Sequence, residues 1–243
     1  MKLELANIEK VYQGRVVLRI ENLRLESGKA YAVLGPNGSG KTTLLRLISA
    51  IEKADRGMIS YDGQPGLPYG DIAYLPQQPY IFDTTVLENL TLALGTVLSG
   101  AKTARERAQH ALESFQMQQF SQARALSLSG GEAQKIAILR TLILNRKLVL
   151  LDEPTAAVDI PSMKLVENYI SQVINRNKAT LIFSTHNPSQ AARLADEIII
   201  LWEGRLVEKG PCDQVLYHPA QPETKAFLEY WVHAHVRPPE CRT

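Results

Sequence analysis

Cysteine is scarce in this sequence, and the two cysteines present are not spaced for a metal site or a redox pair. Cys212 and Cys241 stand far apart and form no CxxC motif. Disulfide scaffolds belong to oxidising compartments and use many cysteines at short spacings. We therefore interpret both residues as reduced thiols and expect the protein to be kept in a reducing compartment.

Long apolar runs are also missing. A helix that spans a bilayer needs roughly 18 or more consecutive apolar residues, and even the apolar stretch from Ile136 to Leu144 is broken by Arg140. Lys2 and Glu4 interrupt the start of the chain, where a secretory signal would need an apolar core. The sequence therefore predicts a cytosolic protein without a membrane span.

A strong net charge is the third absence. The 27 lysines and arginines are balanced by 25 aspartates and glutamates, which leaves a formal charge of +2. This is too small to indicate nucleic-acid binding by bulk electrostatics, so we expect no nucleic-acid partner. What is present is enough length for a substantial core: 243 residues, 45% of them hydrophobic, fit one large α/β domain or a domain with an attached subdomain.

A glycine-rich loop is the most informative stretch. Apolar residues 30–34 lead into Gly35, Pro36, Asn37, Gly38, Ser39, Gly40, Lys41, Thr42 and Thr43, and Leu44 to Ile48 follow at helical spacing. This predicts a strand, a loop and a helix. Gly35, Gly38 and Gly40 can take backbone angles closed to other residues, so that successive N–H groups point at one phosphate chain.

The residues after the glycines sharpen this prediction. Lys41 would reach the β- and γ-phosphate oxygens, Thr42 would place a hydroxyl on Mg²⁺, and the helix would direct its positive dipole end at the same anion. A loop that only turns a corner would explain neither the lysine nor the hydroxyl. The predicted ligand is a nucleoside triphosphate. GTPases, kinases, helicases and transport ATPases all use such a loop, so it does not choose among them.

A second pair of glycines lies in Leu128-Ser129-Gly130-Gly131-Glu132, ahead of the apolar helix. Ser129 and Glu132 fit a capping box, so a well-capped helix start is the simpler interpretation. It leaves the adjacent glycines unexplained, because each costs about 1 kcal/mol in a helix relative to alanine. Bare amides beside a hydroxyl at a helix N-terminus make a second phosphate site. The sequence thus predicts two on one chain.

Polar residues follow three predicted buried strands, 72–75, 147–151 and 179–184. The first is followed by Gln77, the second by Asp152 and Glu153, and the third by His186. Ligands bind at the carboxyl edge of a parallel sheet. There Asp152 could hold Mg²⁺ and Glu153 could polarise the attacking water. His186 could contact a γ-phosphate; taken singly, Gln77 and His186 could equally be solvated loop residues.

The remaining chain predicts two further parts. Residues 1–29 alternate apolar and polar positions between turns, which favours short antiparallel strands. Tyr12, at the first turn, could stack on a purine or simply pack within its strand. Residues 84–126 read as an all-helical insertion, with a capping box at Thr85 and Glu88 and helical pieces at 103–115 and 117–125.

Together, and in this order along the chain, these elements resemble the nucleotide-binding subunit of ATP-binding cassette (ABC) transporters. The motifs that carry the resemblance are the aromatic Tyr12, Walker A from Gly35 to Thr42, Gln77, the signature from Leu128 to Glu132, Walker B from Leu148 to Asp152 with Glu153, the loop around Asp159, and His186. Ala156-Ala157-Val158-Asp159 departs from the commoner Ser-Ala-Leu-Asp, and Lys135 stands where arginine is frequent.

The resemblance implies an α/β fold: a P-loop NTPase core with a mainly parallel central sheet, an N-terminal antiparallel β subdomain and an inserted α-helical subdomain. Within a single ABC ATPase domain of residues 1–243, it implies a RecA-like catalytic core with the β subdomain at 1–83 and 127–232. The helical subdomain would occupy 84–126, and a tail would occupy 233–243.

It also implies ATP with Mg²⁺ and a head-to-tail homodimer in which each ATP lies between one copy's Walker A and the other copy's signature. Catalytic roles fall to Lys41, Glu153 and His186. Mg²⁺ would be held by Thr42, Gln77 and Asp152. ATP would contact Tyr12, the loop Gly35 to Thr43, Gln77, Ser129, Gly130, Gly131, Glu132 and Asp159.

The partners implied are two integral-membrane permease subunits, docked near Tyr80, Ile81 and Phe82, and, indirectly, a solute-binding protein. The protein would then lie on the cytoplasmic face of the cell membrane as a peripheral subunit. The segments 204–211, 215–219 and 224–228 are similar to importer subunits for small solutes such as amino acids, phosphate or tungstate, and overall likeness favours an oxyanion. The alternatives are an amino-acid importer, an exporter, and a soluble ABC ATPase acting on DNA or ribosomes.

Overall fold

A computed structural model describes residues 1–234 apart from 67, 69 and 96–99. Its strands are β1 (Leu3–Tyr12), β2 (Arg15–Leu25), β3 (Ala30–Leu34), β4 (Arg56–Tyr61), β5 (Gln64–Pro65), β6 (Ile72–Leu75), β7 (Leu148–Asp152), β8 (Thr180–Ser184), β9 (Glu197–Trp202) and β10 (Arg205–Pro211). Its α-helices are α1 (Lys41–Ile48), α2 (Val86–Gly95), α3 (Ala101–Ser114), α4 (Gly130–Leu142), α5 (Ile160–Asn177), α6 (Pro188–Leu194), α7 (Cys212–Tyr217) and α8 (Pro222–Ala234). The predicted tail, with Cys241, falls almost entirely outside the described residues.

All the described strands form one sheet in the order β5-β4-β1-β2-β10-β9-β3-β8-β7-β6. The block β9-β3-β8-β7-β6 is parallel, as predicted. The N-terminal strands β1, β2 and β4 pair antiparallel, also as predicted. They continue the same sheet through β10, which runs parallel to β2 at Arg205 and Arg19. The carboxyl ends of β3, β8, β7 and β6 therefore lie along one edge.

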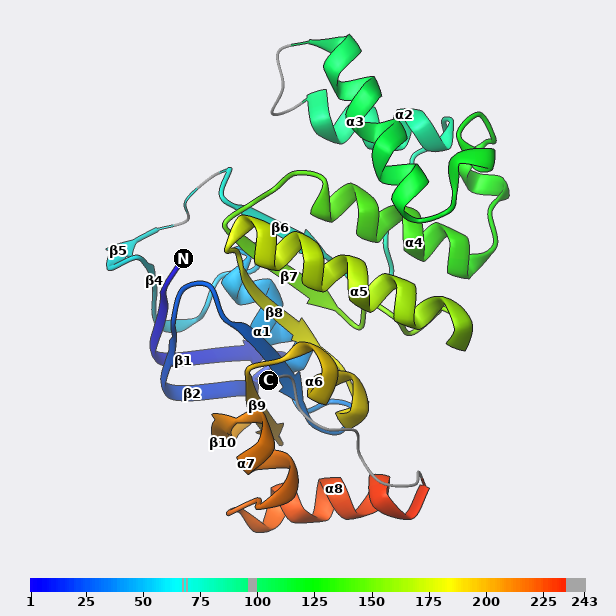
Figure 1. Ribbon diagram of the computed structural model, residues 1–243. Coiled ribbons are helices and arrows are strands. Elements are labelled where there is room, and N and C mark those ends of the chain that lie inside the picture. Colours follow the sequence, from blue (N-terminus) through cyan, green and yellow to red (C-terminus); the bar gives the residue numbers. More distant parts are fainter. Residues whose placement is uncertain (67, 69, 96–99, 235–243) are drawn as a thin grey trace.

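Two layers of buried apolar side chains cover the faces of this sheet; Figure 1 shows helices such as α5 and α1 on its opposite faces. Alternate residues of β3 divide between them, because successive side chains of a strand point to opposite faces. Ala32 and Leu34 join the layer that includes α2 to α6, whereas Tyr31 and Val33 join the layer that includes α1 and the antiparallel strands. The parallel core is thus buried on both sides, which explains its continuous apolar runs.

The inserted helices α2 and α3 lie beyond α4, as Figure 1 shows. The prediction of a helical piece at 117–125 is wrong. The structure has a 3₁₀ turn at Gln118–Phe120 and a second at Ala125–Ser127. Gln116 takes a left-handed φ of 55°, which ends α3, and Ala123 and Ala125 then bond backbone groups of residues 84–86 instead of continuing a helix.

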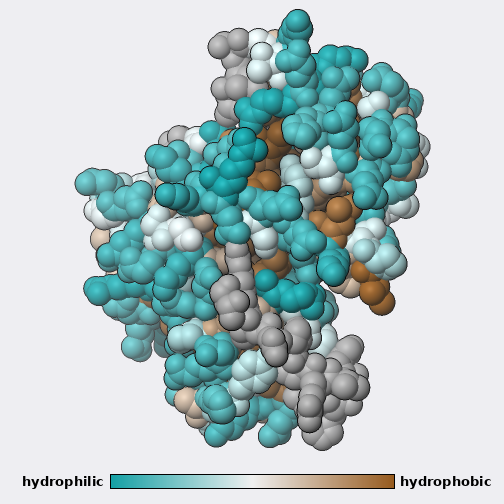
Figure 2. Space-filling model, in the orientation of Figure 1, coloured by the Kyte–Doolittle hydropathy of each residue, from teal (hydrophilic) through white to brown (hydrophobic). Residues whose placement is uncertain are grey.

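Strand β6 also differs from prediction. It was expected to be a buried strand, but it lies at the edge of the sheet, and Ile72 and Tyr74 are only half-buried. Hydrophilic residues predominate on the face shown in Figure 2, with hydrophobic residues in separate small patches. None of the described helices is long and apolar enough to cross a membrane.

Candidate phosphate-binding site

The glycine loop joins β3 to α1 and has the predicted backbone. Gly35, Gly38 and Gly40 have φ values of 147°, 78° and 100°, all in the region that favours glycine. A Cβ on Gly35 would lie 2.1 Å from the Leu201 carbonyl oxygen. Space as well as conformation therefore requires glycine at this position.

Lys41 points its ammonium group back into the loop. Its Nζ donates to the carbonyl oxygens of Gly35 (2.8 Å) and Pro36 (3.0 Å). Burial lowers the pKa of Lys41, and the nearby carboxylates of Glu153 and Asp152 oppose that shift. The ammonium group thus lies within the loop, near the carboxylates of Asp152, which ends β7, and Glu153, which follows it.

A pocket of about 440 Å³ opens at this loop. Its lining brings together segments that are distant in sequence: Tyr12, Val17, Asn37, Gly38, Gly40, Lys41, Thr42, Thr43, Gln77 and Glu153. Tyr12 is 39% exposed, and its hydroxyl donates to the Glu52 carboxylate. The predicted aromatic, glutamine and carboxylate therefore do meet the loop. Val17 is an addition that no sequence signal marked.

Asp152 lies at the end of β7 and is fully buried. Its Oδ1 accepts a hydrogen bond from Ser184 Oγ at 2.5 Å, and its Oδ2 has no hydrogen-bond partner in the described part of the chain. A buried carboxylate oxygen without a partner is costly unless a cation compensates it. The oxygen-rich donor set of Asp152, Thr42 and Gln77 suits Mg²⁺, so these residues fit the metal that the sequence predicts.

Glu153 follows Asp152 with an unusual backbone, a left-handed φ of 48°. Its N–H donates to Ser184 Oγ at 2.9 Å, and its Oε2 lies 3.0 Å from His186 Nδ1. Non-glycine residues held in this region cluster at functional sites. Ser184 contacts both acidic residues, yet sequence reasoning missed it; its only signal was its place at the end of a buried strand.

The His186 ring has a second neighbour that the sequence did not indicate. Trp231, on α8, lies with its ring centroid 5.9 Å from that of His186 and its plane tilted by 36°. The two rings come from distant parts of the chain. The carboxylate of Glu153 and the ring of Trp231 together contact the imidazole.

The second glycine pair begins α4, and its predicted capping box is confirmed. The Glu132 N–H donates to Ser129 Oγ at 3.4 Å, and the Ser129 N–H donates to Glu132 Oε2 at 2.8 Å. Ser129 Oγ also donates to that carboxylate oxygen at 2.7 Å. The two bonds that Ser129 donates lower the pKa of Glu132. A Cβ on Gly131 would lie 2.9 Å from the Ala157 carbonyl oxygen, so Gly131 packs closely on the loop before α5.

Asp159 caps α5 by accepting from the Ser162 N–H at 2.9 Å, and Lys135 of α4 lies 3.6 Å from the same carboxylate. Neither Asp159 nor any residue of 128–132 is among the described residues that line the pocket at the glycine loop. The two predicted phosphate sites therefore occupy separate places on one chain.

Comparison with known proteins gives consistent matches. The sequence pattern of the family described as ABC transporter matches residues 18–156. A tungstate uptake system ATP-binding protein from Peptoclostridium acidaminophilum is 35% identical over 209 residues, which cover 86% of this chain and 98% of that protein. A probable sulfate/thiosulfate import ATP-binding protein from Chlorella vulgaris is 32% identical over 233 residues, covering 94% of this chain and 99% of that protein.

Among solved structures, a dimeric ATP-binding cassette in a post-hydrolysis state, bound to ADP and phosphate, is 26% identical with a TM-score of 0.77. The match covers 86% of this chain and 98% of that chain.

Proposed function

This chain belongs to the ABC transporter family and is an ATPase whose hydrolysis of ATP is coupled to transport; on that premise we propose that it powers the import of a small oxyanion through separate permease chains. One observation supports a nucleotide site shared between two copies of this chain: on a single copy, Ser129 is not among the described residues that line the pocket at the glycine loop. Relatives named for tungstate uptake and for sulfate/thiosulfate import support the class of cargo.

Two copies paired head to tail would bring the two phosphate sites together. The loop of one copy and the Ser129 end of α4 in the other would then hold the same triphosphate. A ligand that contacts both copies stabilises the dimer, and its hydrolysis weakens it. The dimeric cassette with ADP and phosphate among the similar structures supports this arrangement.

The residues around the loop have distinct roles in this proposal. The loop amides and Lys41 bind the phosphates, and Tyr12 stacks on the base. Mg²⁺, held by Thr42, Asp152 and Gln77, would neutralise charge on the phosphate oxygens. Glu153 accepts a proton from the attacking water, and His186, in contact with Glu153, keeps that carboxylate oriented.

Glu153→Gln tests the dimer and the base together. Removing a general base lowers the rate by about 10²- to 10⁴-fold, while the loop that binds ATP is unchanged. We expect ATP binding without turnover, and a dimer on size exclusion when ATP is added. Glu203→Gln is the matched control, because Glu203 shares the left-handed φ (47°) but is exposed in the hairpin between β9 and β10.

Two results would contradict this assignment. Turnover close to that of the unaltered protein would remove Glu153 from the role of base. A variant that binds ATP yet stays monomeric, with and without its permease, would refute the shared nucleotide site.

The permease contact is proposed at residues 80–82. Tyr80 and Phe82 are 69% and 41% exposed, and their rings meet edge to face at 5.3 Å. Aromatic side chains, tyrosine among them, are enriched among the residues that anchor protein interfaces. We expect Tyr80→Ala to reduce copurification with the permease while leaving ATP binding intact; Tyr230→Ala, with 79% exposure on α8, is the control.

The cargo is tested by purifying the complex with its partners and identifying the solute that the solute-binding protein carries. A tungstate-like or sulfate-like oxyanion is expected. An amino acid on that protein would favour the alternative importer. A complex that moves solute outward would favour the exporter.

A further inference from the structure

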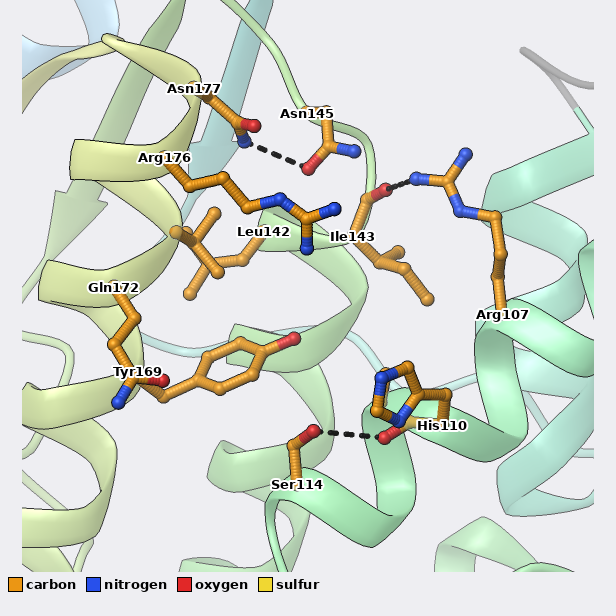
Figure 3. Close-up of a pocket in the computed structure, with 12 residues that line it drawn as sticks. Arg107, His110, Ser114, Leu142, Ile143, Asn145, Tyr169, Gln172, Arg176 and Asn177 are labelled. Atoms are coloured by element: carbon orange, nitrogen blue, oxygen red, sulfur yellow. Dashed lines mark hydrogen bonds between the residues drawn. The ribbon is translucent and has the colours of Figure 1, made fainter.

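A second, larger pocket lies away from the phosphate-binding residues. It has a volume of about 660 Å³ and is lined by α3, by α5 and by the end of α4 with the residues that follow it. Figure 3 shows side chains from these segments facing a common space. The pocket therefore lies between the inserted helices and the core of the chain.

Two lining residues carry a fixed positive charge, Arg107 of α3 and Arg176 of α5. The third basic residue, His110 of α3, has its Nδ1 3.7 Å from the Glu113 carboxylate. The described residues that line the pocket include no aspartate or glutamate. In the described ranges neither guanidinium forms a salt bridge, so the charges of Arg107 and Arg176 are not neutralised by a carboxylate of the chain itself.

Both guanidinium groups lie near the phenol of Tyr169. Burial raises the pKa of Tyr169, and the charges of Arg107 and Arg176 both oppose that shift. In Figure 3 the Tyr169 hydroxyl points into the space between α3 and α5. One nitrogen of Arg107 donates to the Ile143 carbonyl oxygen at 3.1 Å, which anchors that side chain at the rim.

The rest of the lining is of two kinds. Apolar side chains form one wall, namely Ala111, Leu142, Ile143 and Val173. Amides lie beside the arginines, with Asn177 Nδ2 donating to Asn145 Oδ1 at 2.9 Å. A pocket with an apolar wall and a few convergent polar groups is the usual form of a small-molecule site, typically about 300–1,000 Å³.

We propose that this pocket binds a small organic anion whose carboxylate or phosphate group pairs with Arg107 and Arg176 and whose apolar part lies against Leu142, Ile143 and Val173. Guanidinium groups favour such anions because they offer paired N–H donors in a plane. The volume exceeds what a bare oxyanion would fill, which separates this ligand from the proposed cargo.

The position of the pocket gives the ligand a route to the ATPase. Ser129 caps the start of α4 and Asp159 caps the start of α5, and both helices end at the pocket. A ligand that joins α3 to these two ends would favour one position of α4 and α5, and so would change the position of Ser129 and Asp159 at their other ends. We therefore infer that the anion is an effector of nucleotide binding.

The binding test uses calorimetry with two probes that each join an anionic group to an apolar part, phenyl phosphate and 4-methylpentanoate, in Mg²⁺-free buffer with ADP saturating the glycine loop. We expect at least one probe to bind. Arg176→Gln and Arg107→Gln should each weaken its affinity about tenfold or more, the loss of one charged hydrogen bond. Arg105→Gln is the matched control, because Arg105 is an exposed residue of α3 outside the lining.

The outcomes decide the proposal. The proposal is overturned if neither probe binds at about 10 mM, because the binding free energy would then be weaker than about 3 kcal/mol. An equal loss in Arg105→Gln would also overturn it, because that would indicate attraction to surface charge alone. If Arg107→Gln unfolds because its bond to Ile143 is lost, Arg176→Gln still decides, since its guanidinium lies on the other side of the pocket.

The effector role has its own readout. Saturating probe should change ATP affinity by about fivefold or more, a typical coupling between two sites, and should have no such effect on Arg176→Gln. Binding without any change in ATP affinity would remove the effector role. Failure of ATP to bind at all would instead bear on the proposed function, so the two failures are distinguishable.

Discussion

Trp231→Ala removes the ring that lies against His186. The centroids are 5.9 Å apart, and the His186 side chain is 54% exposed, so few other groups hold the imidazole. An aromatic pair of this kind contributes about 0.5–1.5 kcal/mol. Losing it would lower the population of imidazole correctly placed beside Glu153 by about twofold to twelvefold. We expect kcat to fall by that factor.

The expected change is confined to kcat because Trp231 is not among the described residues that line the nucleotide pocket. The Michaelis constant for ATP should stay unchanged, and Trp231→Phe should restore much of the rate. The neighbouring Tyr230→Ala is the control, because Tyr230 is 79% exposed. Steady-state ATPase kinetics measure the effect, and thermal unfolding checks that α8 still packs.

Two results would refute this reasoning. The first is an unaltered kcat in Trp231→Ala with the protein folded. The second is an equal loss in Tyr230→Ala, which would mean that α8 matters but the ring does not.

Three further predictions concern the nucleotide. Lys41→Ala should abolish ATP binding by calorimetry; an unchanged affinity would contradict the assigned loop. Tyr12→Ala should cost about 1–3 kcal/mol of ATP affinity and leave inorganic triphosphate unaffected, with Tyr217→Ala, also 39% exposed, as control; equal weakening of both ligands would exclude stacking. Gly131→Ala places a Cβ 2.9 Å from a backbone oxygen of the loop before α5, so turnover should fall while a single chain still binds ATP; unchanged turnover would show that this close contact is dispensable.

Local elements were predictable because their causes are local. The glycines at positions 35, 38 and 40 have the backbone angles that the loop spacing indicated. The capping box of Ser129 and Glu132 is formed as expected. Each of these conformations follows from residues within one or two turns of chain, so a sequence window predicts it; only the close approach of Leu201 to Gly35 is a distant cause.

The predictions were wrong where hydrogen bonds to distant backbone groups override a local preference for helix. Residues 117–125 carry helix-forming side chains, yet Ala123 and Ala125 bond the backbone near Thr84. The short helices α6 and α7 were not anticipated, since a helix of six or seven residues gives too little periodicity to recognise. Hydrogen bonds to remote segments cannot be seen in a sequence window.

By itself, then, the sequence determined the glycine loop, the capped α4 and the acidic residues that end β7, because each depends on neighbours along the chain. Only the tertiary structure decided which of these meet. Strand order sets Ser184 of β8 against Asp152 of β7, the packing of α8 sets Trp231 on His186, and the inserted helices set Arg107 opposite Arg176. The physical reason is that such contacts join groups far apart along the chain, and the packing of the whole sheet and its helices fixes their distances.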